Sequence, residues 1–167
     1  DIFIIARARF LLQANSGPGS VAWMFGVPVA AANWTPMCQG PLGQQDMRIP
    51  KLVVKGSPPT ALSFDRLLGS DRLRDLHTSL DFSQAGVEWQ DNTAEEIREL
   101  ATEMLDRLEG VARYEPLDEE LQGRFQELVA SRLTPATWGT MSKIGRHFLR
   151  THADLFEGKS VSKSATR

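Results

Sequence analysis

The chain of 167 residues is long enough for one domain with a hydrophobic core, because a chain of this size buries about two-thirds of its unfolded surface. Its hydrophobic content of 41% and charged content of 24% are typical of a soluble globular protein. The formal net charge of -2 excludes a general attraction to nucleic acid or anionic membrane. The only cysteine, Cys38, excludes an internal disulfide and offers no metal-ligand spacing.

The ends of the chain and its longest apolar stretch bear on location. The stretch 21–32 is interrupted by Gly26 and Pro28 and is shorter than the roughly 20 residues that span a bilayer. We therefore expect a cytoplasmic protein with at most peripheral contact to the inner face of a membrane. The amino terminus lacks an initiator Met and a signal peptide. We expect the chain to be the carboxy-terminal part of a longer protein.

The first predicted elements surround a turn. The apolar run 9–14 predicts a strand that is buried on both faces, and residues 15–20 predict a turn. A short helix over 21–25 would be capped by Gly26, and a second strand would cover 29–33. The connection has the length of a βαβ crossover, so the two strands are expected to be parallel.

The middle of the chain gives weaker signals. Residues 34–45 are rich in Pro, Gly and Gln and predict a long loop, which is where functional residues often lie. An apolar run at 52–54, a short helix at 64–68 and a strand or edge segment at 86–90 follow.

The remainder predicts helices. Thr93 and Glu96 form a capping box for a helix that ends at Gly110. Further apolar faces predict a second helix through Leu121, Phe125, Leu128, Val129 and Leu133, and a third through Met141, Ile144, Phe148 and Leu155. The expected fold is α/β: a partial Rossmann-like parallel sheet in residues 1–110, carboxy-terminal helices in 111–157 packed on it, and a disordered tail at 158–167.

The predicted turn has the chemistry of an anion site. A parallel strand that feeds a helix brings free N–H groups and the positive end of the helix dipole to one point. The turn consists of Asn15, Ser16, Gly17, Pro18, Gly19 and Ser20, whose glycines would leave room for phosphate oxygens and whose serines could donate hydrogen bonds. The alternative, about equally favoured by the spacing, is that Asn15 and Ser16 only cap the helix. The turn is neither a Walker A loop nor a Rossmann fingerprint.

The residues around this turn resemble a known family. The string at 8–18, followed by 25–29 and by Asn33-Trp34, resembles the donor half of GT-B glycosyltransferases. The closest similarity is to a bacterial glycosyltransferase family of surface-polysaccharide synthesis, in which an Asp-x-x-x-Pro-Lys segment and a helical tail follow. Here these correspond to residues 46–51 and 142–150.

The resemblance implies a two-domain enzyme that moves a sugar from a nucleotide donor to a glycan or lipid-linked acceptor. The donor diphosphate would lie at residues 15–20, with Lys51 as a further partner. Heptosyltransferase relatives typically have Asp and His where this chain has Asn15 and Ser20, which argues against a heptose donor. GT-B enzymes generally need no metal, so neither a metal nor another cofactor is expected. The missing amino-terminal acceptor domain would supply the general base.

Four further residues are candidates for the donor site, each with a structural alternative. Lys51 could neutralise phosphate or be a surface lysine. Asp46 could orient Lys51 or accept a sugar hydroxyl, or it could make an Asx-turn. Asn33 and Trp34 leave the second strand at its carboxyl end and could contact sugar or base, although a tryptophan that closes the core is at least as common.

The basic side chains of the third predicted helix are weaker candidates. Lys143, Arg146, His147 and Arg150 could touch lipid or acceptor, but a solvated helix face is favoured. The sequence thus predicts a donor-binding glycosyltransferase fragment that is inactive in isolation. The alternatives are a noncatalytic nucleotide- or phosphate-binding module and a structural interaction domain.

Overall fold

The computed structural model describes residues 1–37, 39–41, 43–74, 76–132 and 142–157. Its first half contains α1 (Ile2–Arg7), β1 (Leu11–Gln13), α2 (Pro18–Met24), β2 (Val29–Trp34), β3 (Met47–Pro50), β4 (Leu52–Lys55), β5 (Thr60–Ala61), α3 (Phe64–Leu68) and α4 (Asp71–Arg74). Its second half contains α5 (Ser79–Ala85), β6 (Glu88–Gln90), α6 (Ala94–Glu109), α7 (Pro116–Arg132), β7 (Lys143–Ile144), α8 (Arg146–Thr151) and a 3₁₀ turn at Ala153–Phe156. The predicted tail at 158–167 lies outside the described residues.

A parallel sheet forms the centre of the fold. Within the described residues it has four strands in the order β1-β2-β3-β7. Leu11 lies opposite Val29 in β2, and Met47 in β3 lies opposite Lys143 in β7. The α/β class and the parallel pairing of the first two strands are therefore confirmed, and the sheet is compatible with a partial Rossmann-like fold.

A smaller antiparallel sheet continues from the carboxyl edge of the first. Its order is β5-β4-β6, and β4 follows β3 with only Lys51 between them. The sequence predicts one segment over residues 47–55 with an apolar run at 52–54. In the structure this segment forms β3 of the parallel sheet and β4 of the antiparallel sheet. Pro50 ends β3, consistent with its lack of an N–H for the ladder.

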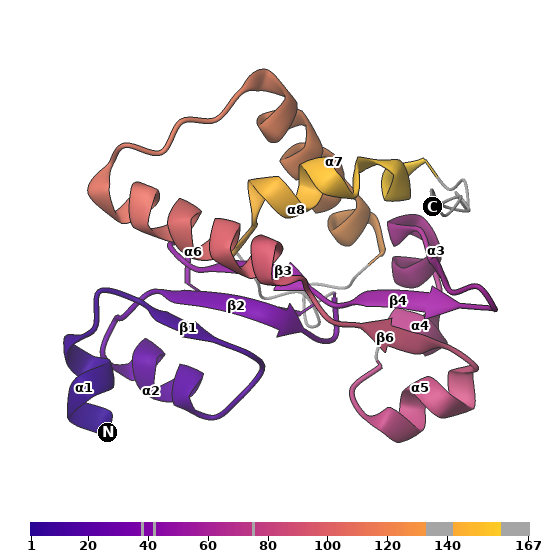
Figure 1. The fold of residues 1–167 in the computed structure, drawn as a ribbon, viewed down its shortest axis with the longest axis horizontal. Helices are drawn as coiled ribbons and strands as arrows, with labels where there is room; N and C mark the ends of the chain where they lie inside the picture. Colours follow the sequence, from indigo (N-terminus) through magenta and orange to yellow (C-terminus); the bar gives the residue numbers. More distant parts are fainter. Residues whose placement is uncertain (38, 42, 75, 133–141, 158–167) are drawn as a thin grey trace.

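Helices cover both faces of the parallel sheet (Figure 1). The helices α6, α7 and α8 lie on one face, and α1 and α2 lie on the other. The larger core lies under the first group and includes Met47, Ile49, Phe64, Leu100, Met104, Phe125, Ile144 and Phe148. The smaller core lies against α2 and contains Ala22, Val27, Val29, Ala31 and Trp34.

The helix predictions succeed where local signals are strong. The structure has the capping box of Thr93 and Glu96 at the start of α6, and Gly110 ends that helix with φ of 73°. Gly26 follows α2 with φ of 69°, as predicted, although α2 already begins at Pro18.

The third predicted helix is wrong in its first part. Lys143 and Ile144 form β7 beside β3, and α8 begins only at Arg146. The backbone N–H of Lys143 donates to the carbonyl of Asp46 at 3.2 Å, and that of Gly145 donates to the carbonyl of Arg48 at 3.0 Å. Residues from the predicted helical segment 111–157 therefore complete the sheet as well as cover it.

Candidate functional site

The turn after β1 lies at the carboxyl edge of the parallel sheet. Asn15 Nδ2 donates to the carbonyl of Thr35, just beyond β2, at 2.7 Å. Ser16 Oγ lies 3.3 Å from both Gln13 Oε1 and the carbonyl of Ala14, so its single hydroxyl hydrogen can serve only one of them at a time. These contacts hold the turn against the ends of two strands while the residues from Asn15 to Pro18 stay exposed.

The start of α2 leaves backbone donors available. Gly17 is the N-cap residue, with φ of -55° and ψ of -37°, and no side chain caps the helix. Among the described residues, the N–H groups of Ser16 and Gly17 have no acceptor. A Cβ atom at Gly17 would meet nothing within 4 Å. The alternative in which Asn15 and Ser16 cap α2 is therefore not what the structure has.

Gly19 has a different role from the one predicted. It is buried, and a Cβ atom there would lie 2.1 Å from Nε2 of Gln13. Its missing side chain thus makes room for Gln13 rather than for a phosphate oxygen. Gln13 Nε2 is itself buried and has no acceptor among the described residues, which is uncommon for a buried donor.

Lys51 follows the carboxyl end of β3, at the same edge of the sheet as the turn. Its backbone N–H donates to the carbonyl of Trp34 at 3.1 Å, and Trp34 adjoins the Thr35 carbonyl that holds Asn15. Its Nζ lies 2.6 Å from Oδ1 of Asp91 and 5.2 Å from the ring centre of Trp89. An ammonium group has three donors, so this ion pair leaves Lys51 able to bind an anion as well.

Asn33 and Trp34 shape the end of β2. Asn33 has φ of 53°, and its N–H donates to Oδ1 of Asn92 at 2.6 Å while its Oδ1 accepts from the N–H of Asn92 at 2.7 Å. Asn92 Nδ2 also donates to the carbonyl of Pro50 at 2.9 Å, which ties the start of α6 to the end of β3. The backbone N–H and the side-chain oxygen of Asn33 are thus both engaged in hydrogen bonds within the fold.

Trp34 closes the smaller core instead of facing solvent. Its side chain is 7% exposed and packs with Ala22, Val29 and Ala31. The predicted stacking on a base or sugar is therefore wrong for this conformation. Its Nε1 is nevertheless a buried donor without an acceptor among the described residues, as Gln13 Nε2 is.

Asp46 lies at the opposite edge of the sheet. It precedes β3, and its Oδ1 accepts from the N–H of Val29, the first residue of β2, at 2.8 Å. Its Oδ2 accepts from Nε1 of Trp23 at 3.1 Å and from the N–H of Gly43 at 2.9 Å. The carboxylate is 2% exposed. The predicted contacts of Asp46 with Lys51 or a sugar are corrected to a structural role at the amino edge.

The long loop after β2 covers a buried arginine that the sequence analysis missed. Arg48 is 2% exposed, and its Nη1 donates to Oγ of Ser142 at 2.5 Å. A Cβ atom at Gly40 would lie 2.2 Å from Nη1 of Arg48, so only glycine fits there without movement. Alternation along β3 places Arg48 on the opposite face from Met47 and Ile49.

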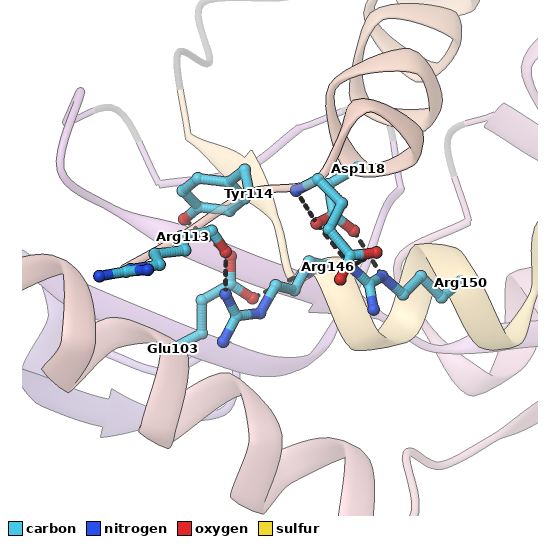
Figure 2. Close-up of polar contacts among 7 residues, drawn as sticks. Glu103, Arg113, Tyr114, Asp118, Arg146 and Arg150 are labelled. Carbon is cyan, nitrogen blue, oxygen red and sulfur yellow. Dashed lines mark hydrogen bonds and ion pairs between the residues drawn. The ribbon is translucent and has the colours of Figure 1, made fainter. Parts of the chain in front are cut away.

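The basic residues of the carboxy-terminal segment hold helices together (Figure 2). Arg146 Nη1 donates to the carbonyl of Arg113 at 2.6 Å. The backbone N–H of Arg146 donates to Oε2 of Glu103 at 2.8 Å. Tyr114 Oη donates to Oε1 of Glu103 at 2.9 Å. Burial raises the pKa of the Glu103 carboxyl, and burial together with this carboxylate raises the pKa of the Tyr114 phenol.

A second ion pair links α8 to α7. Arg150 contacts Asp118 through Nε at 2.5 Å and Nη2 at 2.7 Å, as the dashed lines of Figure 2 show. It also contacts Glu115 at 3.1 Å. The solvated face favoured for these basic residues is thus wrong for Arg146, which is half-buried, whereas Arg150 is exposed as predicted; both residues join α8 to neighbouring helices. His152 contributes likewise, because its Nε2 lies 2.6 Å from Oε1 of Glu96.

Replacing Arg150 by methionine is expected to lower the free energy of unfolding at pH 7 by about 2 kcal/mol, because the buried Asp118 carboxylate loses a charge-assisted pair. The hydrogen bonds from Arg150 lower the pKa of Asp118. Stability from this pair is therefore fully present above the unfolded pKa of about 3.9 and is lost as the pH falls through the lower folded pKa. Urea unfolding of both proteins from pH 7 down to acid would measure the difference, and a difference that grows on acidification would contradict the account.

Further residues that sequence reasoning missed lie in β6 and in the segment between β6 and α6. Trp89, Asp91 and Asn92 contact Lys51 or Asn33 across about forty to sixty positions of sequence. The only local signal is a polar pair, Asp91-Asn92, between a predicted strand and a capping box. No group of three or more His, Cys, Asp or Glu side chains in the described ranges could hold a metal ion.

Protein-family models, curated proteins and solved structures gave no match. No relative therefore adds to what the geometry of the carboxyl edge shows. Of the helices in the described part of the chain, none has both the length and the apolar character needed to cross a bilayer.

Proposed function

We propose that the chain is the donor-binding part of a glycosyltransferase and holds the diphosphate of a nucleotide sugar at the turn after β1. The observation that carries the proposal is the set of unpaired donors there. The N–H groups of Ser16 and Gly17 have no acceptor among the described residues, at the carboxyl edge where open α/β sheets bind ligands.

The surrounding charges support an anionic ligand. Pro18 opens α2, whose first turn contains no acidic residue, so the positive end of the helix is not neutralised locally. Lys51 adds a cation at the same edge of the sheet. Its backbone N–H donates to the carbonyl of Trp34, and the carbonyl of the next residue, Thr35, accepts from the side chain of Asn15 in the turn. The resemblance of residues 8–18, 25–29 and Asn33-Trp34 to GT-B enzymes selects a nucleotide sugar among the possible anions.

The proposed reaction displaces a nucleoside diphosphate from the anomeric carbon by an acceptor hydroxyl. Negative charge grows on the diphosphate as the glycosidic bond breaks. Fixed N–H donors and the Lys51 ammonium would bind this charge more strongly in the transition state than in the ground state, which is how such a site accelerates the reaction. The proposal needs no metal, and it places the reaction in the cytoplasm with a glycan or lipid-linked acceptor.

The main alternative is a noncatalytic phosphate- or nucleotide-binding module. The same donors would hold inorganic phosphate, so the two functions differ in whether the base and ribose add affinity. An interaction domain would need none of these donors.

Isothermal titration with UDP, GDP and inorganic phosphate separates these functions. We expect one nucleotide to bind at least about tenfold more tightly than phosphate, because the base and ribose add contacts outside the turn. Equal affinity for phosphate and both nucleotides would favour the noncatalytic module. Absence of binding by all three would contradict a donor site and leave the interaction domain.

A further inference from the structure

A cavity lies away from the turn, between α5 and the antiparallel sheet. Its volume is about 520 Å³, and residues of β4, α5 and β6 line it. Figure 1 shows α5 beside β6 at the end of the molecule opposite α1. Cavities of about 300 to 1,000 Å³ are typical of small-molecule sites, so the hollow has room for one or two sugar rings.

An oriented tryptophan forms part of the wall. Trp89 is 40% exposed, and its ring meets Phe82 edge-on with 5.0 Å between ring centres. The ammonium of Lys51 lies 5.2 Å from the ring centre. Two neighbours therefore fix the indole plane while part of it remains available. Trp89 also connects this cavity to the carboxyl edge, because Lys51 belongs to that edge.

Polar side chains with free hydrogen-bonding capacity complete the lining. Ser79 and Ser83 project from α5, and Glu88 and Lys55 lie on the two strands. All four residues are exposed, and within the described ranges their side chains have no hydrogen-bond or ion-pair partner. The lining thus offers hydroxyl and ammonium groups beside an aromatic face, whereas Glu88 alternates with Trp89 along β6 and its side chain lies on the other face of the strand.

This combination fits a sugar better than other small molecules. A pyranose has an apolar C–H face that packs against an indole ring, and its rim of hydroxyls both donates and accepts hydrogen bonds. We propose that this cavity binds a pyranose. Its role as the terminal sugar of the acceptor glycan rests on the proposed transferase function.

Filling the cavity tests the proposal. Ser83→Trp places an indole in the hollow, whereas Gln84→Trp places the same side chain on the next residue of α5, which does not line it. Both positions are exposed, so both variants should fold like the parent chain. Ser79→Trp is a second filling variant at the start of the same helix.

The probes are the methyl glycosides of glucose, galactose, mannose and N-acetylglucosamine, with the indole N–H resonance of Trp89 followed by NMR. We expect at least one glycoside to shift this resonance saturably, with affinity about tenfold or more weaker in the Ser83 and Ser79 variants and unchanged in the Gln84 variant. The proposal is overturned if no glycoside shifts the resonance, or if the filling variants bind as the parent does.

The same variants distinguish this proposal from the donor site. Ser83→Trp should leave the affinity for UDP and GDP unchanged, because the turn after β1 lies on other elements. Glycoside binding without nucleotide binding would support the sugar cavity and contradict the transferase. Nucleotide binding without glycoside binding would do the reverse.

Discussion

Replacing Asp46 by alanine is expected to lower the free energy of unfolding by about 3 to 4 kcal/mol, while nucleotide affinity stays unchanged. The carboxylate is 2% exposed and accepts hydrogen bonds from the N–H groups of Val29 and Gly43 and from Nε1 of Trp23. Removal leaves three donors without their acceptor, and each such donor costs about 1 to 3 kcal/mol. Water entering the adjacent cavity of about 380 Å³ should satisfy part of this loss.

Asp91→Ala is the matched control, because it removes an aspartate whose side chain is 63% exposed and pairs with Lys51 at the surface. It should cost less than about 1 kcal/mol. Urea unfolding measures both variants, and nucleotide titration follows on the folded proteins. An Asp46 variant that unfolds like the parent but loses nucleotide affinity would restore the sugar-contact role that the sequence predicted.

Local patterns account for the elements that were predicted well. The capping box at Thr93, the apolar face of α6 and Gly110 all lie within one helix and its ends, so the sequence signal and the structure coincide. The turn after β1 was predicted for a similar reason, since an apolar run, two glycines and Pro18 follow one another directly. The burial predicted for this strand is wrong, because β1 lies at the edge of the sheet and Leu12 is 42% exposed.

Elements defined by distant partners were not predictable in the same way. β7 has two residues and exists because Lys143 and Gly145 donate to carbonyls of residues 46 and 48. No periodicity can appear in so short a segment, and its apolar Ile144 also fits a helical face. The sequence pattern consequently predicts a third helix that includes these two residues.

The residues of the candidate site likewise fall into those with a local sequence signal and those whose roles depend on distant contacts. Asn15, Ser16 and Gly17 could be predicted because the donors belong to one turn. The roles of Asp46 and Gly19 could not, because they depend on which side chains the fold brings near them: three donors for Asp46, and Gln13 for Gly19. The pairing of Lys51 with Asp91 likewise joins residues 40 positions apart.

The largest effect on binding is expected from a bulky side chain at Gly17. This residue has helical φ and ψ angles that any amino acid adopts, and the space around a Cβ atom is open. Gly17→Trp should therefore fold normally, yet its indole would occupy the space in front of the free N–H groups. Nucleotide affinity should fall about 100-fold or more, equivalent to about 2.7 kcal/mol. Gly17→Ala is the matched control and should bind within about threefold of the parent.

The most direct measurement of the central claim is calorimetric titration of the parent, Gly17→Ala and Gly17→Trp proteins with the nucleotide that the parent binds. Equal unfolding midpoints would establish that all three are folded. The account predicts retained affinity for the parent and the alanine variant and loss of binding for the tryptophan variant. Unchanged affinity in a folded Gly17→Trp protein would contradict a donor site at this turn.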